Sequence, residues 1–173
     1  MKNVLLILLA AVIVIASAAG LVPKEETAHA EYLRIHIRAN SNDEQDQSVK
    51  YEVKEKVVGF LTPLLTECDS KEKAVRIISD NLNNIEKVAD GVLNLRGYPY
   101  TSKAKIRNEL FPTRVYESLT LESGYYDALI LELGEGAGDN WWCVVYPPLC
   151  FTGSGNYVYK SKIKSIIDGF FSN

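Results

Sequence analysis

The sequence contains few of the residues from which metal and cofactor sites are built. Its 173 residues include two histidines, three cysteines and one methionine. Neither His29 nor His36 lies near the closely spaced cysteines, and the cysteine spacing matches no common zinc pattern. The formal charge is −3 and the basic residues are scattered, which excludes the electrostatic footprint of a nucleic-acid-binding protein. We therefore expect no metal, no cofactor, no nucleic acid and no small-molecule substrate.

Signals for a catalytic site are also missing. The glycines between residues 134 and 138 do not form a phosphate loop, because they precede a strand and no Gly-Lys-Ser/Thr follows. Cys143 could in principle be a nucleophile with His36 as its base. A reactive thiolate needs a nearby cation or helix N-terminus, whereas Cys143 lies between Trp142 and Val144 in an apolar run. The sequence therefore predicts a protein without enzymatic activity.

The N-terminus indicates export. Lys2 precedes an apolar run, and Ala16-Ser17-Ala18 is a small-x-small cleavage pattern. Residues 1–22 are thus either a cleaved signal peptide or a retained anchor. The anchor is possible because residues 4–22 are nearly continuously apolar and have about the minimum length for a bilayer span, so they could associate with a membrane. The polar residues 23–31 are expected to be a linker, and residues 32–173 a single extracytoplasmic domain.

Export would permit a disulfide bond. Cys143 and Cys150 are separated by a strand end and two prolines, which could turn the chain back far enough to pair them. Closing so short a loop is worth about 2–3 kcal/mol in the loop-entropy model. The alternative is that both are reduced core cysteines. Cys68 would remain as a buried thiol.

The first half of the domain predicts one strand and two antiparallel helices that pack on a sheet. Apolar residues alternate with basic ones over residues 32–39, so one face of that strand is core and the other is a basic row. A helix with one apolar face follows to about Leu65, with Pro63 bending or ending it. A second helix is expected from a capping box of Asp69 and Glu72 to about Leu93.

The second half predicts mainly strands, which makes the fold class α+β. Extended patterns cover residues 103–108, 119–121, 126–133 and 141–146. A hairpin between the last two strands would give a mainly antiparallel sheet. Residues 159–171 predict an amphipathic C-terminal helix that closes the domain on its own core. The alternatives for this helix are a membrane surface or a partner protein.

One stretch, residues 134–151, holds both tryptophans, two cysteines and a Pro-Pro pair. Consecutive Trp141 and Trp142 must face opposite sides of a strand, so one belongs to the core. The other is covered by this chain or by another protein, and aromatic residues concentrate in interface hot spots. We expect the functional surface, or its support, to include Asn140, Trp141, Trp142, Pro147, Pro148 and Phe151, with His36 and Asn40 as further candidates.

Three segments of the sequence resemble a known family. Asn-Trp-Trp-Cys-Val-Val-Tyr-Pro-Pro-Leu-Cys-Phe follows Gly-Glu-Gly-Ala-Gly at residues 134–151. The other two segments are Leu-Arg-Ile-His-Ile-Arg-Ala-Asn-Ser-Asn at residues 33–42, before an acidic run, and Phe-Pro-Thr-Arg at residues 111–114. Together they are similar to the stage II sporulation protein R family, the extracytoplasmic signalling proteins of endospore-forming bacteria.

The resemblance implies a function. Such a protein is made in the forespore and exported into the space between the forespore and mother-cell membranes. Its partner there is a membrane-embedded aspartic protease of the mother cell, which cleaves the pro-sequence from a sigma factor precursor. The protein would be a non-enzymatic activator of that protease. The alternative, from a different class, is an exported domain that binds or hydrolyses peptidoglycan.

Overall fold

The computed structural model describes residues 31–116 and 119–151. The expected export segment, linker and C-terminal helix (residues 1–30 and 152–173) lie outside this part, apart from Glu31. The strands are β1 (Leu33–Arg38), β2 (Ser102–Phe111), β3 (Arg114–Tyr116), β4 (Leu119–Leu121), β5 (Gly124–Leu133) and β6 (Asn140–Tyr146). The helices are α2 (Glu44–Leu65), α3 (Lys71–Asp80) and α4 (Leu82–Leu95), with a 3₁₀ turn, η1, at Leu149–Phe151.

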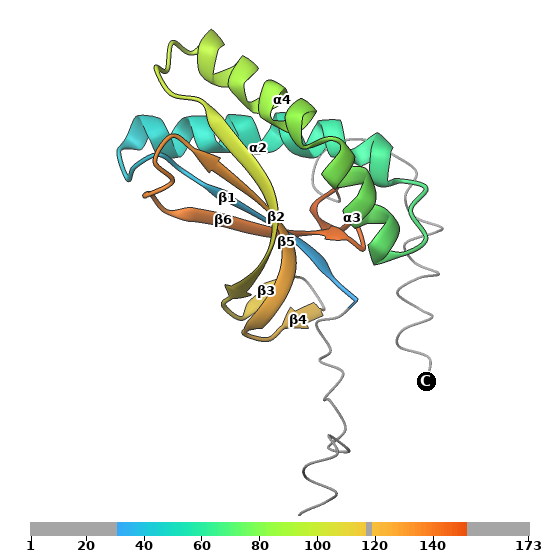
Figure 1. Cartoon of the computed structure of the whole chain (residues 1–173). Helices are drawn as coiled ribbons and strands as arrows, with labels where there is room; N and C mark the ends of the chain where they lie inside the picture. Colours follow the sequence, from blue (N-terminus) through green and yellow to red (C-terminus); the bar gives the residue numbers. More distant parts are fainter. Residues whose placement is uncertain (1–30, 117–118, 152–173) are drawn as a thin grey trace, which may run out of the picture. The chain divides into compact units, whose positions relative to one another are not determined.

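The larger sheet has four strands in the order β2-β5-β1-β6. β1 is parallel to β5 and antiparallel to β6, and β2 is antiparallel to β5. The helices lie on one side of this sheet, and the small β3–β4 sheet lies on the other (Figure 1). The α+β class is therefore confirmed, whereas the sheet is mixed rather than a simple antiparallel meander.

The expected hairpin between the last two strands is wrong, because β1 lies between β5 and β6. The connecting loop, residues 134–139, passes over the end of β1. Gly138 donates its N–H to the carbonyl of Ala39 at 2.9 Å, and Ala137 donates to that of Asn40 at 3.2 Å. Six residues are long for a tight hairpin but suffice to cross two strand spacings. The central position of β1 satisfies backbone groups on both of its edges.

The second predicted helix is two helices, separated at Asn81. The apolar stripe is continuous through this point, with Ala74, Ile78, Ile85 and Ala89 all fully buried. Asn81 leaves the helical conformation, and its side chain donates to the carbonyl of Ile77 at 2.9 Å. An asparagine side chain competes for helix backbone groups in this way, and periodicity alone does not register it.

Helix α2 agrees with the prediction in extent and in its buried face, and it continues two residues beyond Pro63. The capping box predicted for the next helix is displaced by one residue. Ser70, rather than Asp69, is the N-cap, and its hydroxyl accepts from the N–H of Lys73 at 3.2 Å. Serine caps a helix as effectively as aspartate, so either residue could have started it. Within residues 31–116 and 119–151, no helix has the length and apolarity needed to cross a membrane.

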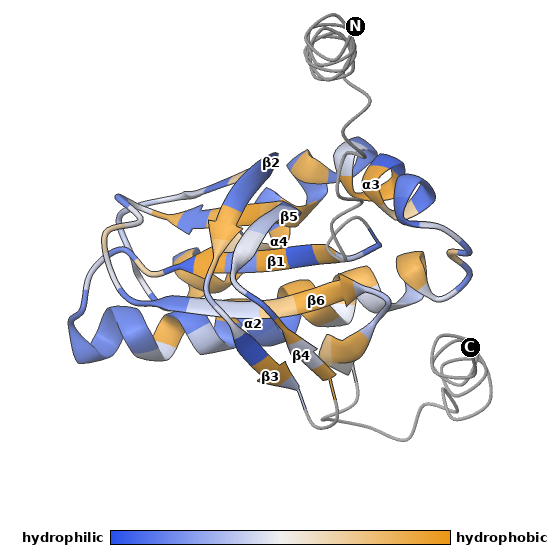
Figure 2. Ribbon diagram, turned by 90° about the horizontal axis from the view of Figure 1, so that it is seen from below, coloured by the Kyte–Doolittle hydropathy of each residue, from blue (hydrophilic) through white to orange (hydrophobic). Residues whose placement is uncertain are grey.

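β1 is buried on both faces. Leu33, Ile35 and Ile37 pack with the helices in the main core, as the alternation predicts. The ribbon of β1 alternates between apolar and polar segments (Figure 2). The basic row on the other face is nevertheless covered, because Arg34 is 0% and His36 only 4% exposed. A row of charges inside a protein needs partners, and those partners define the candidate site.

Candidate functional site

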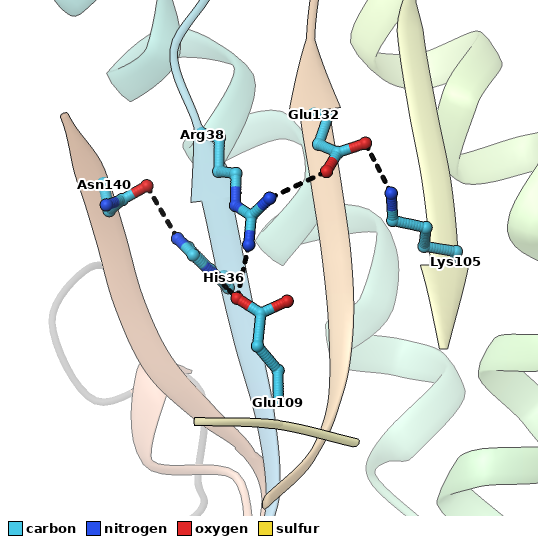
Figure 3. A network of polar contacts seen from close by, with 6 residues as sticks. All are labelled: His36, Arg38, Lys105, Glu109, Glu132 and Asn140. Atoms are coloured by element: carbon cyan, nitrogen blue, oxygen red, sulfur yellow. Dashed lines mark hydrogen bonds and ion pairs between the residues drawn. The ribbon is translucent and has the colours of Figure 1, made fainter. Parts of the chain in front are cut away.

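We use the name outer sheet face for the side of the four-stranded sheet that faces away from the helices. Four strands contribute to it. Six of its polar residues form a connected charge network (Figure 3): His36, Arg38, Lys105, Glu109, Glu132 and Asn140.

Each carboxylate of the charge network is held by two basic groups. Glu132 accepts from Arg38 at 2.9 Å and from Lys105 at 2.6 Å. Glu109 accepts from His36 at 2.9 Å and from the other guanidinium branch of Arg38. Burial alone would raise the pKa of Glu132, but Lys105 and Arg38 outweigh burial and lower it. The network is a set of mutually satisfied, partly buried charges, which fixes the side chains in place.

The sequence suggested His36 as a possible base for Cys143 and as a candidate for the functional surface. Its Nδ1 faces Glu109 Oε1 at 2.9 Å, and its Nε2 lies 2.7 Å from the Asn140 amide. The ring also packs against Trp142 and Phe111, with centroid distances of 5.3 and 5.8 Å. Both nitrogens are thus occupied. Burial lowers the pKa of His36, and its hydrogen bonds to Asn140 and Glu109 offset this only in part.

His36 should therefore make stability depend on pH near neutrality. Because the folded pKa is below the unfolded value of about 6.5, the unfolded chain binds more protons in the interval between them. We expect the free energy of unfolding to fall as pH drops through about 6.5, and this contribution to level off below the folded pKa. Urea denaturation across this range measures it. His36→Gln, which keeps a hydrogen-bond donor and acceptor at this position but does not titrate, should remove the slope; an unchanged slope would contradict this assignment.

The two tryptophans lie on opposite sides of β6, as their adjacency requires. Trp141 packs against the main core on the helix side, with Lys54 Nζ 5.8 Å from its ring centroid. Trp142 lies on the outer sheet face between His36 and Arg114, whose guanidinium carbon is 4.3 Å from the ring centroid. Both rings are half-buried. The covering element for Trp142 includes β3, which supplies Arg114.

Asn40 connects the segment at residues 33–42 to the segment at residues 134–151. Its amide nitrogen donates to Asp46 Oδ2 at 2.8 Å, and its Oδ1 accepts from the N–H of Glu135 at 3.0 Å. Asp46 also accepts from Ser41 Oγ at 2.7 Å and from the hydroxyl of Tyr100 at 2.6 Å. Burial would raise the pKa of Asp46, but these three hydrogen bonds together lower it. In the structure, Asn40 positions the loop before β6 and contributes nothing to the charge network.

The two prolines among the candidate residues are buried. Pro147 and Pro148 are buried after a cis Tyr146–Pro147 bond, so they lie beneath the surface. Phe151 ends η1, and its side chain lies outside the described part. Cys143 and Cys150 form a disulfide with a Cα–Cα distance of 5.9 Å, and Cys68 is a buried free thiol. The expected pairing is confirmed.

Arg34 is a feature that the sequence did not single out. Its guanidinium lies 4.3 Å from the ring centroid of Phe111 and 4.9 Å from that of Tyr126, and it donates to the hydroxyl of Tyr116 at 2.6 Å. Nε and Nη1 have no hydrogen-bond partner among the described residues. Burial lowers the pKa of Arg34. Only the alternation in β1 could have indicated it, by placing Arg34 in the same row as His36.

The residues of the charge network lie on one face of the sheet, and their polar groups are paired with one another rather than left free for catalysis. His36 has no free nitrogen, and Cys143 is bonded to Cys150. Among the described residues, no group of three or more His, Cys, Asp or Glu side chains could hold a metal ion. What the face offers is a rigid polar surface with a half-buried tryptophan at one side, which suits recognition.

The fold and this face define a disulfide-bonded α+β domain whose candidate site is an ion-paired sheet surface. Residues 29–156 match the family model described as stage II sporulation protein R. The chain is also 31% identical over 166 residues to stage II sporulation protein R of Bacillus subtilis (strain 168), covering 90% of this chain and 74% of that relative. The chain belongs to the stage II sporulation protein R family. No solved structure matches it.

Proposed function

We propose that this protein is a non-enzymatic, exported signal of sporulation. In this proposal it acts between the forespore and mother-cell membranes, where it activates a membrane-embedded aspartic protease that processes the mother-cell sigma factor precursor. The observation that carries the proposal is family membership across residues 29–156. The protein supplies binding energy and no chemistry. It therefore shifts the protease toward an active state by binding that state more tightly than the inactive one.

The geometry supports a binding role. His36 and Cys143 could in principle have formed a base and a nucleophile. Instead, His36 is held in the charge network, and Cys143 is bonded to Cys150. The contact surface in this proposal is the part of the outer sheet face around Trp142, with Asn140 beside it on β6 and Arg114 stacked on the ring. Tryptophan and arginine are the residue types enriched in interface hot spots. Trp141, on the helix side of β6, supports this surface from behind, and Pro147 and Pro148 are buried directly after the strand.

Reconstitution in a non-sporulating host tests the proposal. The sigma factor precursor and the protease are expressed with and without this protein, and cleavage is followed by immunoblot. We expect cleavage only when the protein is present. Trp142→Ala should reduce it at least tenfold, since hot-spot truncations cost about 2 kcal/mol or more. Absence of cleavage with all components folded and correctly located would contradict the proposal and favour the peptidoglycan-binding alternative.

A matched aromatic control separates contact from general damage. Tyr51 lies on α2 in the helical layer and is 50% exposed. Tyr51→Ala removes an exposed aromatic ring far from the outer sheet face, so cleavage should remain at the level of the unmodified protein. Export and folding of both variants are compared by fractionation and by urea denaturation. Equal loss of cleavage in both would show that Trp142 is not a contact residue.

A further inference from the structure

β2 is an edge strand, and part of its outer edge has no hydrogen-bond partner among the described residues. Gly134 donates its N–H to the carbonyl of Thr101 at 2.9 Å, so residues 101 and 134 are a hydrogen-bonded pair at the start of the β2–β5 ladder. Hydrogen-bonded and non-hydrogen-bonded pairs alternate from there along the ladder. The odd-numbered residues of β2 are therefore hydrogen-bonded to β5, and the N–H and C=O groups of the even-numbered residues point away from the sheet. The structure thus presents a row of outward backbone groups along one side of β2.

Helix α4 closes the first part of this row. Asp90 accepts from the N–H of Ser102 at 2.6 Å, and Glu86 accepts from the N–H of Ala104 at 2.9 Å. Because these carboxylates occupy the two N–H groups, a further strand cannot pair with them. No hydrogen bond involves the outward backbone groups of the next three even-numbered residues within the described part of the chain: Ile106, Asn108 and Leu110. An edge in this state is a template for a further strand.

The side chains beside this open edge are basic. The odd-numbered residues of β2 point to the outer sheet face, and four of them are charged: Lys103, Lys105, Arg107 and Glu109. Glu109 and Lys105 are already paired inside the charge network. Lys103 and Arg107 are exposed, and neither forms an ion pair with a described carboxylate. Neither cation therefore has a close ion-pair partner. Arg107, beside the open part of the edge, interacts with Glu132 only through space, and Lys103 lies beside the part that α4 closes.

We propose that the open edge of β2 binds an acidic, extended segment of the partner protein, which joins the sheet as an added strand. Main-chain hydrogen bonds to residues 106–110 would supply affinity. Carboxylates on the outer side of the added strand, beside Arg107 and extending toward Lys103 past the paired stretch, would supply specificity and speed the encounter. On the opposite side, the added strand would meet Leu110, which is 57% exposed. The preferred segment therefore alternates acidic and apolar residues.

Other occupants of the edge fit less well. A second copy of this chain would bring the same two exposed cations, and the carboxylate in its corresponding row, Glu109, is already paired with His36 and Arg38. An anionic membrane would attract the cations but offers no backbone to pair with the outward groups of residues 106–110. The identification of the partner as the protease rests on the proposed function; the acidic-strand chemistry is tested without it.

Amide hydrogen exchange of the full chain in detergent micelles tests the docking chemistry. The probes are a seven-residue peptide of alternating glutamate and valine, and its lysine–valine counterpart. At about ten times its Kd, the glutamate peptide should slow exchange about tenfold at Ile106, Asn108 and Leu110. Ser102 and Ala104, already bonded to α4, are the internal control and should not change. No slowing up to millimolar peptide, or equal slowing by both peptides, would overturn the proposal.

Two sets of variants sharpen the result. Lys103→Glu with Arg107→Glu should transfer the preference to the lysine peptide, whereas Lys56→Glu with Lys87→Glu, an equal charge change on exposed helix positions, should not. Asn108→Pro removes an outward N–H and should weaken binding, while Asn108→Ala keeps that N–H and should bind normally. Binding by a self-associated chain would appear as a concentration-dependent dimer by sedimentation and would also overturn the proposal.

The two proposals fail in distinguishable ways. If the edge binds acidic strands but the protease is not the partner, the glutamate peptide protects residues 106–110 and precursor cleavage never depends on this protein. If the protease is the partner but docks elsewhere, the Lys103 and Arg107 charge reversals leave cleavage intact while Trp142→Ala abolishes it. If both hold, cleavage falls with both sets of variants and not with the Lys56 and Lys87 control.

Discussion

Replacing Gly138 with alanine is expected to lower the free energy of unfolding by about 3 kcal/mol, the upper end of the cost of overpacking a filled site. An added Cβ would overlap the carbonyl carbon and oxygen of Ser41 and lie 3.0 Å from the Cβ of Ala39. These are mostly backbone atoms, which cannot rotate aside as the end of a side chain could. Ser41 is also held by its hydroxyl, which donates to Asp46. Urea denaturation of the full chain measures the loss.

Two other glycines provide controls for the same substitution. Gly91, in α4, has no atom within 4 Å of an added Cβ, so Gly91→Ala should stabilise the protein by about 0.5–1 kcal/mol through helix propensity. Gly136 has φ +62°, with Glu132 at 3.3 Å, and its substitution should cost about 1–2 kcal/mol. If Gly138→Ala is no more damaging than Gly136→Ala, the close approach to Ser41 is not what requires glycine there.

The close approach at Gly138 has a consequence for the candidate site. The loop that crosses β1 leads directly into β6, which carries Asn140 and Trp142 on the outer sheet face. Asp139 donates its N–H to Asn42 Oδ1 at 2.6 Å, and its carbonyl accepts from Lys50 Nζ at 3.0 Å. The start of β6 is therefore anchored to residues just beyond β1 and to α2. Loosening the loop should displace the proposed contact surface even where the core stays intact.

Local patterns in the sequence were sufficient to predict much of the fold. Alternation located β1, and runs of apolar, aromatic and β-branched residues located β5 and β6. The two tryptophans were placed on opposite faces because successive side chains in a strand point in opposite directions. The apolar stripe located α2 with its end at Leu65. The pairing of Cys143 with Cys150 followed from their short separation and the intervening prolines. Each of these features is determined within a few residues of chain.

Features that depend on distant residues were not predictable. No local signal places β1 between β5 and β6, since strand order depends on which edges have satisfied partners after the helices have packed. The alternation in β1 gave a basic row, but it could not show that Glu109 and Glu132, more than seventy residues away, would cover it. Periodicity also missed the break at Asn81, because a side chain competing for backbone hydrogen bonds leaves the apolar stripe unchanged.

The same limit applied to the candidate site. The sequence located Trp142, Asn140 and His36, and the structure brings these three together on the outer sheet face. It also suggested Asn40, which the structure places in the joint between α2 and the loop instead. Arg38, Glu109 and Glu132 were missed, because individually they are ordinary strand charges. Only their cross-strand neighbours, fixed by register, turn them into a network.

The Cys143–Cys150 disulfide should stabilise the domain by about 2.5 kcal/mol, from the entropy of a loop closed over a sequence separation of 7. Cys143→Ala with Cys150→Ala should lower the free energy of unfolding by about that amount, measured by urea denaturation without reductant. Adding reductant should bring the unmodified chain close to the variant and leave the variant unchanged. Cys68→Ala, at a buried free thiol, should instead cost the same with and without reductant.

The difference between the oxidised and reduced chains also relates to the compartment in which the protein is stable. A disulfide persists in an oxidising compartment and is lost under cytosolic reduction. The bond joins β6, which bears Trp142, to η1, so reduction should loosen the strand that carries the proposed contact surface. The oxidised chain should then activate the protease more strongly than the double alanine variant at equal export. Equal stability of the oxidised and reduced chains would show that the bond does not stabilise the strand that carries the proposed contact surface.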